Sequence, residues 1–123
     1  MTYKVNVSRV FAGAHFLRNY KGKCENLHGH NWKIKASFSK GDFLDENGMV
    51  EDFSDIKFYL DNVMDYLDHK CLNDICPFDK INPTAENIAG FILDELIKVE
   101  TGGLKVLEVE VWESEGNSAV KTR

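Results

Sequence analysis

Two stretches of the chain alternate between apolar and polar residues, which is the pattern of a β-strand with one buried face. They cover residues 3–16 and residues 28–38, and in the second every even-numbered position from Trp32 onward is apolar while the odd-numbered ones are polar. The alternation therefore predicts that His28 and His30 lie on the apolar face of the second strand. In the first stretch, the residues that share one face are Val5, Val7, Arg9, Phe11, Gly13 and His15.

Two further stretches have apolar residues at the three- and four-residue spacing of an amphipathic helix. The first covers residues 53–67, and Asp52 or Ser54 can cap its N-terminus. The second follows Pro83, with Thr84 as N-cap, and ends before two glycines at 102–103. The predicted buried faces are Ile56, Leu60, Val63 and Leu67 in the first helix, and Ile88, Ile92, Leu96 and Val99 in the second.

Two strands are predicted at the end of the chain, over residues 104–113 and 118–123. The first of them should place Leu107, Val109, Val111 and Glu113 on one face. The element order is then ββααββ, which predicts an α+β fold: an antiparallel four-stranded sheet with two helices on one face. At 123 residues the chain is expected to be a single domain, residues 1–123.

The composition argues against several classes of function. A formal net charge of −5 gives no basic surface for nucleic acid. The sequence contains no apolar run of membrane-spanning length and no signal-peptide core at the N-terminus, so we expect a cytoplasmic protein that does not contact membranes. Three widely spaced cysteines are an odd number, which makes a disulfide framework improbable.

The candidate chemistry is concentrated in residues 15–30, which hold three of the four histidines. His28 and His30 share a strand face, and His15 can join them from the neighbouring strand. Three imidazoles with an open fourth position are the ligand set of a catalytic zinc ion, Zn²⁺. Cys24, four residues before His28, is then a candidate for acid–base or nucleophilic work.

Four sequence blocks resemble the 6-pyruvoyltetrahydropterin synthase superfamily and together cover essentially the whole chain. The most similar branch is the bacterial and archaeal 6-carboxytetrahydropterin synthases of queuosine biosynthesis, which share the short spacing between cysteine and histidine pair. Enzymes of the tetrahydrobiopterin pathway usually place more residues there, and a folate-linked group has glutamate instead of cysteine. The blocks are Phe11-Ala-Gly-Ala-His15, Cys24-x3-His28-Gly-His30, Leu67-Asp-His69 with Leu72-Asn-Asp74, and Asn82-Pro-Thr-Ala-Glu86 with Glu113.

The resemblance implies a tunnelling fold, in which ββααββ subunits form trimers that stack into a homohexamer. It implies a pterin triphosphate, 7,8-dihydroneopterin triphosphate, as substrate and 6-carboxy-5,6,7,8-tetrahydropterin, acetaldehyde and triphosphate as products. It implies zinc on the three histidines and a catalytic group with these members: Cys24 as the acid–base thiol, Asp68 and His69 as its partners, and Glu113 as the anchor of the pterin ring.

Several alternatives remain open from the residues alone. The same site could give a pyruvoyl or hydroxymethyl pterin, or the chain could be a zinc hydrolase or a non-catalytic zinc module. Arg18, Lys21 and Lys23 could bind the triphosphate or simply form a solvated loop. Cys71 and Cys76 are expected to be structural or surface thiols, because their spacing fits no usual zinc knuckle.

Overall fold

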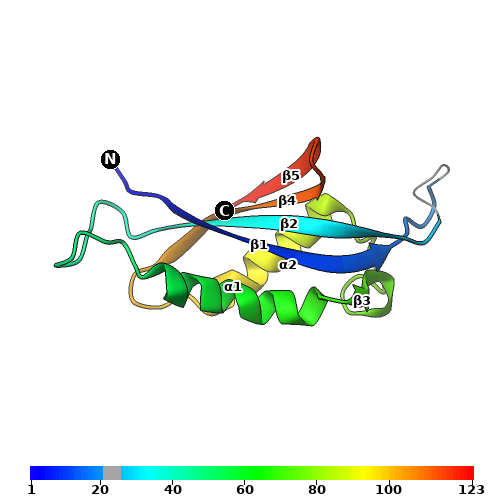
Figure 1. Ribbon diagram of the computed structural model, residues 1–123, viewed down its shortest axis with the longest axis horizontal. Coiled ribbons are helices and arrows are strands. Elements are labelled where there is room, and N and C mark those ends of the chain that lie inside the picture. The colour runs from blue at the N-terminus through cyan, green and yellow to red at the C-terminus, as the bar shows by residue number, and fades with distance from the viewer. Residues whose placement is uncertain (21–25) are drawn as a thin grey trace.

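A single sheet carries both helices on one of its faces (Figure 1). The computed structural model describes residues 1–20 and 26–123. The strand order is β3-β1-β2-β4-β5, and every neighbouring pair is antiparallel except β1 and β3. The elements are β1 (Val5–His15), β2 (His28–Ser39), α1 (Phe53–Leu67), β3 (Lys70–Cys71), the one-turn 3₁₀ helix η2 (Leu72–Asp74), α2 (Ala85–Lys98), β4 (Lys105–Ser114) and β5 (Asn117–Thr122).

The α+β architecture predicted from the sequence is confirmed, but the strand count was wrong. The sheet has five strands rather than four, because β3 adds a two-residue parallel pairing with Gly13 and Ala14 of β1. Two residues cannot show an alternating pattern, so hydrophobic periodicity gives no signal for this strand.

Both helices begin where the capping residues predict. The Asp52 side chain accepts a hydrogen bond from the Ser54 N–H at 2.8 Å, and Thr84 accepts one from the Asn87 N–H at 3.1 Å. The predicted buried faces are confirmed except for Val99. That residue is the C-cap of α2 and is 47% exposed, because the helix ends before its side chain reaches the sheet. Among the described residues, neither helix is long and apolar enough to cross a membrane.

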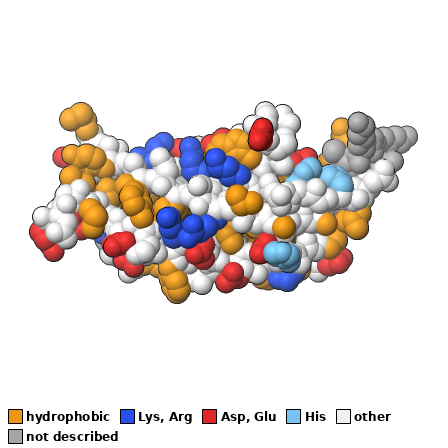
Figure 2. Space-filling model, viewed as in Figure 1, with side chains coloured by type: hydrophobic (Ala, Val, Ile, Leu, Met, Phe, Trp, Pro, Cys, Tyr) orange, Lys and Arg blue, Asp and Glu red, His pale blue; other side chains and the backbone are white. Residues whose placement is uncertain are grey.

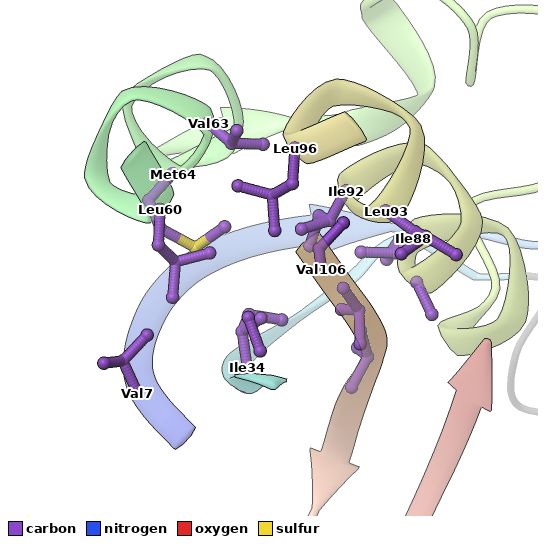
Figure 3. Close-up of a cluster of buried hydrophobic side chains, with 14 of the residues drawn as sticks. Val7, Ile34, Leu60, Val63, Met64, Ile88, Ile92, Leu93, Leu96 and Val106 are labelled. Atoms are coloured by element: carbon purple, nitrogen blue, oxygen red, sulfur yellow. The ribbon is translucent and has the colours of Figure 1, made fainter. Parts of the chain in front are cut away.

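The core lies between the helices and the sheet. Figure 3 shows Leu60 and Met64 of α1 and Ile92 and Leu96 of α2 pointing toward Ile34 of the sheet. One prediction for β4 needs correction. Leu107 was predicted on the same face as Val109 and Val111, but a bulge in the pairing of β4 with β2 leaves it without a partner residue on β2. The fully buried residues of β4 are Val106, Val109 and Val111.

This arrangement brings several chain segments together at one end of the molecule, on the right in Figure 1. The end of β1, the start of β2, the short β3 and the start of α2 meet there. The predicted site residues of the described chain lie at this end.

Candidate metal centre and active site

Strand pairing assembles the three histidines. In the antiparallel register of β1 and β2, His15 lies directly opposite His28, and Gly13 lies opposite His30. Because residues opposite each other point to the same face, all three imidazoles gather on the helix side of the sheet. Their ring centroids are 4.6 Å apart for His15 and His28, 4.7 Å for His28 and His30, and 5.2 Å for His15 and His30.

Two backbone carbonyls fix which ring nitrogens face the cluster. His15 Nδ1 lies 2.7 Å from the Pro83 carbonyl oxygen, and His28 Nδ1 lies 2.6 Å from that of Asn26. A carbonyl only accepts, so each Nδ1 carries the hydrogen and, in a neutral ring, each Nε2 carries a lone pair. These two Nε2 atoms are 3.0 Å apart. With no hydrogen between them, two lone pairs face each other, and a cation between them would bind both.

The third imidazole also presents an unsatisfied nitrogen. His30 Nε2 is buried and has no hydrogen-bond partner among the described residues. Glu113 Oε1 lies 3.2 Å away, close enough for an ion pair but outside hydrogen-bond geometry. Burial lowers the pKa of His30, although the negative charge of Glu113 acts to raise it. Burial also lowers the pKa of His15. Both rings therefore favour the neutral form that binds metals.

The four side chains form a set that could hold a metal ion. One ligand atom from each of His15, His28, His30 and Glu113 lies within 4.8 Å of the others. A tetrahedral zinc ion with nitrogen ligands at about 2.0–2.1 Å holds them roughly 3.3–3.4 Å apart, close to the observed spacing of the first two. The donors, three imidazoles and a carboxylate, are those that zinc takes in proteins.

Asp68 and His69 form a close carboxylate–imidazole pair, although adjacent side chains seldom meet. His69 Nδ1 lies 2.8 Å from Asp68 Oδ2, and the left-handed backbone of His69 (φ 58°) permits this approach. The Ala12 N–H donates to Asp68 Oδ1 at 2.9 Å. This hydrogen bond, followed by that of His69, lowers the pKa of Asp68. His69 Nε2 has no hydrogen-bond partner among residues 1–20 and 26–123, and 82% of the side chain is exposed.

A groove of about 500 Å³ is lined by His69 and by His30, together with Ala12, Ala14 and Asn31. In the strand register these last three residues point to the face opposite the imidazoles, so the groove opens on the side of the sheet away from the helices. Figure 2 shows histidine side chains exposed at two separate places toward the same end of the molecule. Cys71 also lines the groove, whereas Cys76 is exposed elsewhere. Neither Asp68 nor His69 belongs to the group of ligand atoms that lie within 4.8 Å of one another.

A second cavity, of about 380 Å³, lies on the other side of the cluster. His15, Thr84, Glu86, Glu113 and Ser118 are among its lining residues. Two carboxylates thus border one space beside the histidines, where a ligand with N–H donors could bind between them.

Three of the sequence predictions fall on residues 21–25. Cys24, Lys21 and Lys23 lie outside the described residues, so the thiol and the two lysines keep the status of predictions. Arg18 is described, and its guanidinium donates to the backbone carbonyls of Asn73, Phe78 and Ile81. These hydrogen bonds favour a structural role for Arg18 over a triphosphate contact.

Sequence reasoning missed two features of the site. The carbonyl of Pro83 orients His15, and a backbone atom leaves no signal in residue type. Trp32 is fully buried and packs against the rings of His15 and His30, at centroid distances of 4.9 and 5.2 Å. Its position two residues after His30 in an alternating strand could have predicted this contact.

Comparison with known proteins settles the family. The model of the family described as 6-pyruvoyl tetrahydropterin synthase matches residues 4–123. The chain belongs to this family. The resemblance inferred from the four sequence blocks is thereby confirmed, together with the prediction that the protein is a lyase of this family.

Three members of the family illustrate the similarity. The 6-carboxy-5,6,7,8-tetrahydropterin synthase of Synechocystis sp. is 39% identical over 104 residues, which cover 80% of this chain and 78% of that protein. The human 6-pyruvoyl tetrahydrobiopterin synthase is 38% identical over 103 residues, covering 80% and 70%. The structure of the Caenorhabditis elegans 6-pyruvoyl tetrahydropterin synthase matches all of this chain and 96% of that one, with 26% identity and a TM-score of 0.88. This agreement confirms the predicted tunnelling fold.

Proposed function

We propose that this chain is a zinc-dependent carbon–carbon lyase of queuosine biosynthesis that works in the cytoplasm. Its substrate is 7,8-dihydroneopterin triphosphate. Its products are 6-carboxy-5,6,7,8-tetrahydropterin, acetaldehyde and triphosphate, and the atoms balance when one water is consumed. The observation that carries the proposal is the convergence of three imidazole nitrogens, two of them held as lone-pair donors by backbone carbonyls.

In this proposal His15, His28 and His30 hold the zinc ion. Zinc bound there would act as a Lewis acid that polarises the hydroxyl oxygens of the substrate side chain. The three imidazoles would keep that ion beside the cavity lined by Glu113. The pterin ring could then contact Glu113 while the substrate side chain contacts the metal.

Proton transfer at the side-chain carbons is assigned to Cys24 and His69. Asp68 holds His69 Nδ1 and so leaves Nε2 to exchange a proton, as in other carboxylate–imidazole pairs. The Cys24 assignment rests on the sequence: a thiol close to the histidine pair, between Lys23 and Glu25 in a polar segment, is in a setting that suits a thiolate.

A second candidate product is the 6-pyruvoyl pterin, because a human relative with that name matches 80% of this chain. The pyruvoyl product keeps all carbons of the substrate side chain, whereas the carboxy product loses two of them as acetaldehyde. The short spacing between Cys24 and His28 favours the carboxy product. A zinc hydrolase or a non-catalytic zinc module would have no use for the Cys24 thiol outside the ligand set.

The test compares turnover of dihydroneopterin triphosphate by five preparations: the zinc-loaded protein, the same protein stripped by a chelator, Cys24→Ala, and the two control variants Cys71→Ala and Cys76→Ala. Removing an acid–base group typically slows turnover by about 10²–10⁴-fold. We expect Cys24→Ala to lose turnover by this factor while it still binds zinc. The chelator-stripped protein should lose turnover and regain it when zinc is added back. Both control variants should turn over the substrate at the normal rate. Near wild-type turnover in Cys24→Ala, or full activity without zinc, would show that the proposal is wrong.

A further inference from the structure

Two asparagine side chains continue the hydrogen bonding of β1 past its last strand residue. Asn82 Oδ1 accepts from the Arg18 N–H at 2.8 Å, and Asn82 Nδ2 donates to the Arg18 carbonyl at 3.1 Å. Asn73 makes the same pair of bonds with Phe16, both at 3.0 Å. A primary amide offers the same donor and acceptor as a peptide group, so each asparagine replaces one residue of a neighbouring strand.

Asn82 is also fixed through its own backbone. Its carbonyl accepts from Asn87 Nδ2 at 2.8 Å and from the Thr84 N–H at 2.9 Å. The next residue, Pro83, is buried, and its carbonyl is the acceptor for His15 Nδ1. Asn82 therefore ties the segment that orients His15 both to the end of β1 and to the start of α2.

From these contacts we infer that Asn82 is a positioning residue of the metal centre, acting through the Pro83 carbonyl on His15. The inference rests on the proposed metal site. The partner of the second ring nitrogen sets the tautomer and the direction of a ligating histidine, and its loss typically costs about 10–100-fold in metal affinity. A backbone carbonyl cannot be removed by substitution, so Asn82 is the side chain that controls its place.

The test titrates metal-free protein with Co²⁺ and follows the visible absorption of the bound ion, which reports both affinity and ligand geometry. Wild type, Asn82→Ala and Asn73→Ala are compared, with thermal unfolding of each metal-free variant. Asn73 is the matched control because it makes the same paired bonds to β1 and has no hydrogen bond to residues 82–84. We expect about tenfold weaker Co²⁺ binding and a shifted spectrum in Asn82→Ala, at the low end of the range for such partners. Asn73→Ala should lose thermal stability and keep the wild-type affinity and spectrum.

Asn87→Ala provides a second variant in case Asn82→Ala does not fold, because it removes a bond to the Asn82 carbonyl and leaves the paired bonds to Arg18 in place. It should weaken Co²⁺ binding severalfold. Equal losses of affinity in Asn73→Ala and Asn82→Ala, or wild-type binding in both Asn82→Ala and Asn87→Ala, would overturn the positioning role alone. A wild-type chain that binds no Co²⁺ would overturn the metal centre itself.

Discussion

The Glu113 carboxylate lies where two roles compete. It is 3.2 Å from His30 Nε2, which suits a fourth metal ligand, and it also lines the cavity that contains Glu86. A pterin offers a ring N–H and an amino N–H side by side, and a carboxylate accepts such a parallel pair well. We assign Glu113 to the pterin, because a fourth protein ligand would close the position that a catalytic zinc ion keeps open.

Replacing Glu113 with Gln tests this assignment. The amide keeps the size of the side chain but turns one acceptor into a donor, which faces an N–H of the pterin. An unmatched buried donor costs about 1–3 kcal/mol, so pterin affinity should fall roughly tenfold or more. Titration with a pterin product and metal analysis of the same sample give the answer. A loss of zinc from the variant would show that Glu113 is a metal ligand. Undiminished pterin affinity would indicate that Glu86 holds the pterin ring instead, and Glu86→Gln would test that.

The sequence predicted the direction of the histidine side chains but not their chemical state. Alternation along β2 was sufficient to place His28 and His30 on one face. The tautomer of His15 depends on the Pro83 carbonyl, 68 positions away in the chain, and no local pattern reports that contact. The pairing of Asp68 with His69 likewise depends on a left-handed backbone, which the sequence does not signal at a histidine.

At the scale of elements, two strand glycines beside the histidines have opposite surroundings. A Cβ at Gly13 would lie 3.0 Å from Phe11 Cε2 and 3.5 Å from Leu72 Cγ, and both of those side chains are buried. Phe11 is in addition stacked on Trp32, so it has little room to move. Within the described part of the chain, a Cβ at Gly29 would meet only the Gly13 carbonyl oxygen, at 4.0 Å.

Gly13→Ala should therefore destabilise the protein, and Gly29→Ala should not. Overpacking a filled core costs about 1–3 kcal/mol, which exceeds the roughly 0.5–1 kcal/mol that alanine gains over glycine in a regular strand. Urea unfolding of the two variants measures the difference. If both variants were as stable as the wild type, the packing between β1 and η2 would be looser than the structure shows.

The Glu100 carboxylate joins three elements at the opposite end of the core. Only 10% of its side chain is exposed, and it accepts hydrogen bonds from the Val106 N–H at the start of β4 and from Arg123 after β5. Burial alone would raise the pKa of Glu100, but the bonds from Arg123 and Val106 outweigh it and hold the pKa below its ordinary value.

This pKa shift predicts a specific acid sensitivity. A carboxyl group whose pKa is depressed by folding adds stability above its unfolded pKa, and the gain is lost as pH falls through the folded value. Glu100→Gln should cost about 1–3 kcal/mol near neutral pH. The stability gap between wild type and variant should then narrow as the pH falls below about 4. Urea unfolding across this range measures the gap, with the exposed Glu46→Gln as control. A gap that does not change with pH would contradict the depressed pKa.

Long regular elements were predictable and short irregular ones were not. Residues 53–67 show helical spacing over their whole length, and the predicted helix is confirmed residue for residue. β3 has two residues, and its pairing is created by the turn at His69. Leu107 was mispredicted because a bulge shifts the alternation of β4 by one residue. Val99 was mispredicted because α2 ends at Lys98, one residue before the periodic pattern suggests.

In the whole molecule, both edges of the sheet and apolar residues on one of its faces are exposed. β3 pairs with only Gly13 and Ala14 of β1, and β5 forms the other edge. On the face away from the helices, Val10 and Val120 are 62% and 47% exposed. Open edges and exposed apolar residues favour association with further copies. We propose a homohexamer built from two trimers, as the tunnelling fold implies.

Light scattering tests the assembly. The wild type should behave as a hexamer, or at least as a trimer, at working concentrations. Val10→Asp should shift it toward smaller species, because a charge on the sheet face would be buried between copies. Phe58→Asp is the matched control, since Phe58 is also 62% exposed but lies on α1 and not on the sheet. A wild type that remains monomeric would contradict the proposal.

Identification of the reaction products is the decisive test of the proposed lyase reaction. Zinc-loaded protein is incubated with 7,8-dihydroneopterin triphosphate, the pterin is identified by mass spectrometry, and acetaldehyde is trapped and measured. We predict 6-carboxy-5,6,7,8-tetrahydropterin with equal amounts of acetaldehyde and triphosphate. A pterin that keeps the full side chain without acetaldehyde, a hydroxymethyl pterin, or unchanged substrate would contradict it.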